Sequence, residues 1–135
     1  MYRHAAVALF IGLSLAACGG VTDPSQNTKD IFPGSISPIG VGNNWIGSFN
    51  VAKTGELTIA VATMTPQIPT SVFFAVGYGL NQGGSCQPLS QNTASTVGFP
   101  AISGVQITPG SYCVFVIDEG FFTVPETFTV SVSHP

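Results

Sequence analysis

The sequence predicts an all-β domain, an antiparallel β-sandwich of about seven to eight strands, over residues 31–135. Three observations predict this fold class. Apolar side chains recur at every second position, which places one face of a strand on a core and the other in water. Turn-forming clusters of Gly, Pro, Asn and Ser separate these runs at nearly regular spacing. No sustained helical period occurs after residue 17, so the pattern favours stacked sheets.

Two elements precede this domain. Residues 1–17 have the three parts of an export signal, namely a basic start, an uncharged apolar run and small residues before Cys18. A membrane-spanning helix needs about 20 apolar residues, and this run is shorter, so we expect a cleaved signal peptide. Residues 18–30 are polar and contain Pro24, and they are predicted to form a flexible tether.

The quartet Leu15-Ala16-Ala17-Cys18 resembles a lipobox, the processing signal of bacterial lipoproteins. The resemblance implies cleavage before Cys18, a diacylglycerol thioether on its sulfur and an acyl group on the new amine. Two or more acyl chains hold a protein stably on a bilayer, whereas one chain binds only marginally. Residue 19 is Gly rather than Asp, which in a double-membraned bacterium favours the outer membrane, facing the periplasm or the cell surface. Ordinary secretion and a retained anchor are the alternatives.

The first clear strands of the domain alternate. Residues 44–51 (NWIGSFNV) place Trp45 and Phe49 on one face, which favours a core position for Trp45. Residues 56–63 (ELTIAVAT) alternate in the same way. The turn residues 53–55 (KTG) lie between these two runs and predict a hairpin.

The middle of the domain is more continuously apolar. Residues 71–80 (SVFFAVGYGL) and 112–118 (YCVFVID) are typical of central strands. Residues 64–70 contain two prolines, so this segment is expected to cross over rather than to pair. Strong turn signals occur at 82–85 (QGGS) and 109–111 (PGS).

The last strand is predicted at residues 126–133 (ETFTVSVS), which alternate again. Together with residues 109–116 (PGSYCVFV), this end resembles the closing hairpin of bacterial pre-peptidase C-terminal domains, whose final strands read G-[ST]-Y-x-V-x-V and Y-T-[LV]-x-V. Residues 31–36 and 44–51 are similar to the family's opening strands. The resemblance implies a jelly-roll-like sandwich and a non-catalytic accessory module that binds polysaccharide or protein surfaces. The sequence departs from the family's pattern because it carries no peptidase domain, which leaves a protease-linked role without support.

Charge is scarce in the domain. Polar surface is provided by Ser, Thr, Asn, Gln and Gly, and no basic stripe occurs, so nucleic acid is not an expected partner. Without a basic amphipathic helix, the lipid on Cys18 is the expected membrane contact. From residue 31 onward the five side chains with formal charge are Lys53, Glu56, Asp118, Glu119 and Glu126.

Two cysteines remain once Cys18 is assigned to lipid. In a chain exported to an oxidising compartment, Cys86 and Cys113 are predicted to form a disulfide. The bond closes a loop of 28 residues, which stabilises the fold by about 3.5 kcal/mol on the chain-entropy model. A metal site is the alternative, but two cysteines and His134 make a poor ligand set. No metal or other cofactor is therefore expected.

Signatures of catalysis are missing from the sequence. His134 lies beside the last residue and His4 belongs to the predicted signal peptide, so no base for a Ser-His-Asp or Cys-His arrangement is expected. Asp118 and Glu119 are adjacent, so on a strand their side chains would point to opposite faces of the sheet. We interpret them as a solvated strand end rather than as an acid/base pair or part of a calcium-binding loop. Residues 77–79 (GYG) begin a dinucleotide fingerprint that lacks its third glycine.

Aromatic residues are the candidate ligand contacts. Phe121 and Phe122 lie between two predicted strands, where one of them can fold back as a cap, or both can form an exposed apolar tip. Trp45 is the third candidate. The sequence thus predicts a non-catalytic, lipid-anchored envelope module that binds a glycan or a protein. The alternatives are a structural accessory subunit of an envelope complex and, more distantly, a hydrolase with two carboxylates converging about 5–10 Å apart in a cleft.

Overall fold

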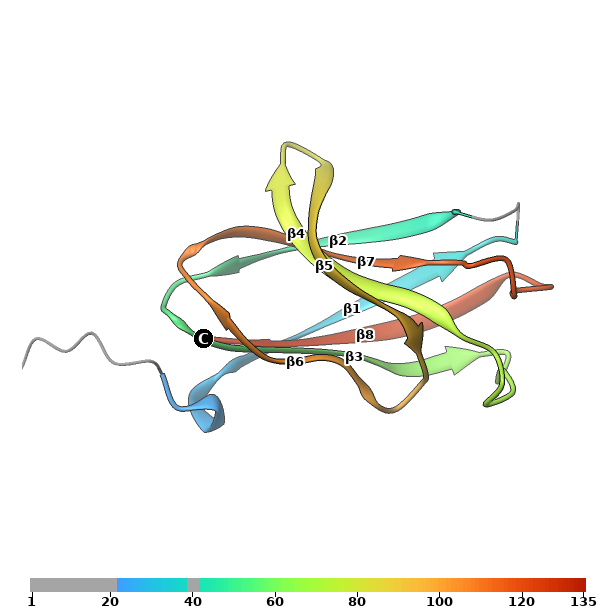
Figure 1. The fold of residues 1–135 in the computed structure, drawn as a ribbon, viewed down its shortest axis with the longest axis horizontal. Coiled ribbons are helices and arrows are strands. Elements are labelled where there is room, and N and C mark those ends of the chain that lie inside the picture. The colour runs from blue at the N-terminus through green and yellow to red at the C-terminus, as the bar shows by residue number, and fades with distance from the viewer. Residues whose placement is uncertain (1–21, 39–41) are drawn as a thin grey trace, which may run out of the picture.

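A computed structural model describes residues 22–38 and 42–135 of the protein, so the predicted signal peptide and Cys18 lie outside it (Figure 1). Eight strands form two sheets of four strands each. The elements are η1 (Pro24–Gln26), a one-turn 3-10 helix, followed by β1 (Thr28–Ile36), β2 (Asn44–Val51), β3 (Gly55–Thr65), β4 (Phe74–Gln82), β5 (Ser85–Ser95), β6 (Pro100–Ile107), β7 (Gly110–Ile117) and β8 (Glu126–His134).

The two sheets have the strand orders β1-β8-β3-β6 and β2-β7-β4-β5, and all pairings are antiparallel. Every connection between successive strands passes to the opposite sheet except the one from β4 to β5. This is the arrangement of a jelly roll, and it confirms the predicted antiparallel sandwich. The strands β4 and β7 are central in their sheet, as their continuous apolar runs predicted. Within the described residues, no helix has the length and hydropathy to cross a membrane.

Two predicted hairpins are wrong. The segment 53–55 joins β2 to β3, and these strands lie in opposite sheets. The closing pair, β7 and β8, is divided between the sheets in the same way. Alternation shows which side of a strand faces the core, but both sheets of a sandwich face the same core, so the pattern does not distinguish a hairpin from a crossing. Of the proline-bearing segment 64–70, residues 66–70 cross over toward β4 as predicted, whereas Met64 and Thr65 still pair with β8.

The folded part begins earlier than the predicted boundary at residue 31. Thr22 bridges to Gly55, and the Asp23 side chain accepts a hydrogen bond from the Ser25 N–H at the start of η1. The Asn27 side-chain amide donates to the Glu56 carbonyl at 2.7 Å. Polar residues thus attach this segment through hydrogen bonds rather than apolar burial, and composition alone does not reveal such bonds.

The core lies between the two sheets and follows the predicted parity. The six apolar positions of β3 and β8 that were predicted to share a face are at most 3% exposed. These six positions are Leu57, Ile59, Val61, Phe128, Val130 and Val132. The central strands β4 and β7 add Phe74, Val76, Val114 and Val116, which are fully buried.

The predicted disulfide between Cys86 and Cys113 is present, with the two Cα atoms 5.8 Å apart. It joins β5 to β7 although β4 lies between these strands in the sheet. The close approach depends on Gly79 of β4, where a Cβ atom would run into the backbone carbonyl of Gln87 on β5. Gly79 therefore lets β5 fold across β4, and this explains the glycines of the segment 77–79.

Candidate functional site

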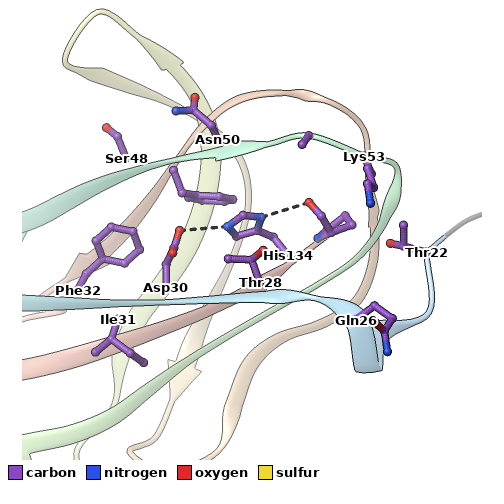
Figure 2. Close-up of a pocket in the computed structure, with 13 residues that line it drawn as sticks. Thr22, Gln26, Thr28, Asp30, Ile31, Phe32, Ser48, Asn50, Lys53 and His134 are labelled. Carbon is purple, nitrogen blue, oxygen red and sulfur yellow. Dashed lines mark hydrogen bonds and ion pairs between the residues drawn. The ribbon is translucent and has the colours of Figure 1, made fainter.

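An open hollow of about 610 Å³ lies between the edge strands β1 and β2, near the first and last described residues of the chain (Figure 2). Its wall combines hydroxyl, amide, carboxylate, ammonium and imidazole groups with the rings of two phenylalanines. The residues that carry these groups include Thr28, Asp30, Phe32, Ser48, Phe49, Asn50, Lys53 and His134.

The strand registers explain why polar groups gather there. On β1, Asp30 has the same inward parity as Phe32 and Ile36, and on β8, His134 has the parity of the buried Val132. The antiparallel register places Thr28 opposite His134 and Asp30 opposite Val132. On each of these two strands, the core-facing positions therefore continue past the apolar core and end with a polar residue. The hollow is the part of the sandwich interior that apolar side chains do not fill.

Asp30 and His134 form the polar centre of the hollow (Figure 2). The Asp30 Oδ2 atom lies 3.1 Å from the His134 Nε2 atom, and the His134 Nδ1 atom lies 3.4 Å from the Pro135 carbonyl oxygen. The imidazole also packs on the Phe49 ring, with centroids 5.3 Å apart. His134 is 5% exposed, whereas the Asp30 side chain is 40% exposed. The imidazole is therefore held in place, and the carboxylate is accessible to a ligand.

The arrangement suits hydrogen bonding to a neutral, polar ligand. Thr28 is exposed on the wall and offers a hydroxyl group, whereas the side chains of Ser48 and Asn50 lie on the outer face of β2 and point away from Asp30 and His134 (Figure 2). Phe32 is half-buried beside Asp30 and offers part of an aromatic face. Among the described residues, no serine or threonine hydroxyl hydrogen bonds to His134, so the Ser-His-Asp geometry of hydrolases is not formed.

The predicted aromatic contacts lie elsewhere. Phe122 is 6% exposed and packs against Phe74, while Phe121 is 55% exposed, so one ring caps the core and the paired apolar tip does not form. Trp45 is half-buried, with its ring centroid 5.6 Å from that of Phe128. None of the three lines the hollow. The hollow's Asp30 and His134 were missed, although their inward parity was readable from the sequence.

Asp118 is not the solvated strand end that was predicted. It is 1% exposed, and its Oδ1 atom accepts hydrogen bonds from the N–H groups of Gly120, Phe121 and Phe122 at 2.8, 3.0 and 3.2 Å. The carboxylate thereby fixes the loop between β7 and β8. The adjacent Glu119 is half-buried.

Glu126, the first residue of β8, is a second buried acid. It is 2% exposed, and its Oε2 atom has no hydrogen-bond partner within the part of the chain that the structure describes. Burial raises the pKa of this carboxyl above its ordinary value of 4.5. Glu126 does not line the hollow between β1 and β2.

The loops at the other end of the sandwich form a different surface. A second hollow of about 380 Å³ lies between the β3–β4 and β5–β6 connections, and apolar side chains such as Met64, Ile68 and Val97 line it. Phe99 at its rim is 69% exposed. This end also exposes Phe73 and Phe121. The two ends thus differ in chemistry, one polar and the other apolar.

Comparison with known proteins gives no relative from which a function could be transferred. No protein-family model, curated protein or solved structure matches the chain. Over residues 22–38 and 42–135, no group of three His, Cys, Asp or Glu side chains is placed to hold a metal ion. The function is therefore argued from the geometry of the site.

Proposed function

We propose that the protein is a non-catalytic, lipid-anchored module of the cell envelope, and that the hollow between β1 and β2 binds a glycan. The observation that carries this proposal is the combination of the Asp30 carboxylate and the Thr28 hydroxyl group with the ring of Phe32 in one open hollow. Planar polar side chains can bond pairs of sugar hydroxyls, and an aromatic face packs on the apolar face of a sugar ring.

The size and charge of the hollow support the same class of ligand. Its volume of about 610 Å³ falls within the range of roughly 300–1,000 Å³ typical of small-molecule sites. Its wall contains one acidic side chain, Asp30, and one lysine side chain, Lys53, so neither sign of formal charge dominates. A neutral, hydroxyl-rich ligand fits this balance better than a strongly charged one.

The same lining favours binding over hydrolysis. Most glycoside hydrolases use two carboxyl groups on opposite sides of the scissile bond. The hollow contains the single carboxylate of Asp30, and the apolar hollow at the other end contains none. Converging acids were the feature expected of a carboxylate-dependent hydrolase, so binding is the function we propose.

The proposed lipid places the ligand near a membrane. Four residue steps separate Cys18 from Thr22, which itself lines the hollow. At most about 3.6 Å per residue, these steps span no more than about 14 Å. The hollow would then lie close to the bilayer surface, where envelope glycans are within reach. Mass spectrometry of the native protein tests the lipid, since a Cys18 without acyl groups would contradict the anchor.

Calorimetric titration tests the proposed ligand. The chain with Cys18→Ser is mixed with soluble peptidoglycan fragments and, separately, with neutral oligosaccharides of three or more sugar units. Thr28→Val removes a wall hydroxyl group and is expected to weaken binding about 2- to 13-fold, because one hydrogen bond contributes about 0.5–1.5 kcal/mol. Thr93→Val, which removes an exposed hydroxyl group on β5, is the matched control and should bind like the parent. Failure of every glycan to bind, or equal loss in both variants, contradicts the proposal.

A second candidate is an accessory subunit of an envelope complex, which the apolar loop end favours. Phe99 and Phe121 are more than half exposed there, and exposed apolar groups of this kind mark contact sites. Affinity capture from envelope extracts with the parent chain and with Phe99→Ser/Phe121→Ser tests it. Loss of one specific protein from the variant sample supports this role, and identical captured proteins contradict it.

A further inference from the structure

The two sheets leave four strand edges. They are formed by β1 and β6 in one sheet and by β2 and β5 in the other. An edge strand presents unpaired N–H and C=O groups, which are a template for pairing with another chain. Natural proteins therefore interrupt exposed edges with charges, prolines or bulges.

Three of the four edges are interrupted in this way. β1 contains Lys29 and Pro33. β5 contains Pro88, and its register with β4 shifts twice. β6 begins at Pro100, has Gly104 at a φ of +68°, and also shifts register twice against β3. None of these three edges offers a long, regular run of backbone groups to another strand.

β2 has none of these interruptions. Its eight residues include no charged residue and no proline, and all eight pair with β7 in an unbroken register. Among the described residues, β7 is its sole strand partner. Ile46 in the middle of the strand is 40% exposed. A regular, uncharged edge of this length is one that a stable protein keeps covered.

The sequence of β2 indicates what covers it. The stretch from Asn44 to Asn50 reads N-W-I-G-S-F-N, in which an aromatic residue and then an asparagine recur at matching distances on either side of Gly47, while Ile46 and Ser48 differ. If two β2 strands pair antiparallel with Gly47 opposite Gly47, Asn44 faces Asn50, Trp45 faces Phe49, and Ile46 faces Ser48. We propose that a second copy of this chain occupies the β2 edge in this register, which joins the two sheets β2-β7-β4-β5 into one continuous sheet.

Two of the three kinds of pair that this register creates are favourable, one on each face of the sheet. Asn44 and Asn50 are exposed on the outer face, where opposed amides can donate and accept in both directions. On the inner face, aromatic residues stand opposite each other on either side of the axis, and cross-strand aromatic pairs stabilise sheets. Glycine suits position 47, at the twofold axis, because the Trp45 ring already covers this position. A Cβ atom on residue 47 would lie 2.7 Å from Trp45 Cη2.

The pairing also has a consequence for the hollow. β2 forms one wall of the hollow, so the second copy lies beside its rim. Because antiparallel pairing about a twofold axis reverses the second copy, the Thr22 residues of the two copies lie toward opposite ends of the joined sheet. The inference does not depend on the glycan proposal, because the interface is built from β2 alone.

Disulfide trapping in cells that produce the full chain tests the register. In an Ile46→Cys/Ser48→Cys chain, each new cysteine faces one on the second copy, with Cβ atoms about 4.5–5.5 Å apart. In the matched Asn44→Cys/Ser48→Cys chain, neither cysteine has a cysteine opposite it. After mild oxidation with copper-phenanthroline, we expect at least tenfold more cross-linked dimer from the first chain. Equal yields from the two chains, no dimer, or cross-linking to a different protein would each overturn the proposal.

Sedimentation velocity of the full chain in detergent gives an independent measurement. The parent is expected to sediment as a dimer and the Ile46→Lys variant as a monomer, because the two lysines face each other diagonally at about 7–8 Å across the axis. Leu89→Lys is the matched control, since Leu89 lies on the β5 edge and is 53% exposed. The control should remain dimeric. A monomeric parent, or a dimeric Ile46→Lys variant, overturns the assignment of β2.

Discussion

Replacing Asp118 with alanine is expected to destabilise the domain by about 3–5 kcal/mol. The Asp118 carboxylate is 1% exposed and accepts three backbone hydrogen bonds from the loop between β7 and β8. The N–H groups of Gly120 and Phe121 belong to exposed residues and can regain water after the substitution. The N–H group of Phe122 lies in the interior and is left without a partner.

The size of this loss in stability follows from the different solvent exposure of the three N–H donors. Hydrogen bonds to a charged acceptor contribute about 1.5–3 kcal/mol, and water recovers part of this for the two exposed donors. Leaving the buried Phe122 N–H unsatisfied costs about 1–3 kcal/mol more. Loosening of the loop also weakens the packing of Phe122 on Phe74. Asp118→Asn keeps an acceptor oxygen, so its cost should be about half that of Asp118→Ala.

Urea unfolding followed by fluorescence measures the change. Trp45 is the single tryptophan of the chain, and its edge-to-face contact with Phe128 makes it a reporter of the folded core. With a denaturant slope of about 2 kcal/mol per M, the midpoint of Asp118→Ala should fall by about 2 M. Glu119→Ala, on the next residue, is the control and should shift the midpoint little. If the two alanine variants are equally stable, the capping role assigned to Asp118 is wrong.

Three further predictions concern stability. Replacing both Cys86 and Cys113 with alanine should lower the free energy of unfolding by about 3.5 kcal/mol, because the disulfide no longer restricts the unfolded chain across a sequence separation of 27 residues. Unchanged stability in urea would contradict this prediction. Gly79→Ala should cost at least about 2 kcal/mol, because its Cβ meets the Gln87 backbone; a wild-type midpoint of thermal unfolding would refute the close approach. Burial raises the pKa of Glu126 above 4.5, so its ionised form destabilises the fold, and stability is lost as pH rises through the folded pKa. Glu126→Gln should therefore be more stable than the parent at pH 7 and no more stable at pH 3, and a pH-independent difference rules out this cause.

The sequence was sufficient for the core because parity is a local property. Val130 and Val132 alternate with small polar residues, and the structure buries both. The disulfide was predictable for a different reason, since only two cysteines remained after Cys18. The connections were not predictable from alternation. A turn such as the segment 53–55 serves equally well within one sheet or between two, and the choice depends on packing across the core.

The polar site between β1 and β2 could be identified only once the fold was known. His134 was dismissed as a residue near the end of the chain, although it continues the inward parity of Val132. Asp30 was assigned to a tether, and only the β1–β8 register brings it to the imidazole. The burial of Asp118 had no signal in the pattern of apolar residues, because it arises from loop N–H groups that need an acceptor.

Nuclear magnetic resonance of the chain from residue 18 with Cys18→Ser, during titration with neutral oligosaccharides of three or more sugar units, tests the central claim most directly. His134 is the single histidine within the described residues, so its imidazole signals report on the hollow without ambiguity. We predict that the signals of His134 and Thr28 shift together with glycan concentration, while those of Phe99 and Phe121 stay in place. Shifts confined to the loop end, or no shifts at any concentration, would contradict the assignment of the hollow as the binding site.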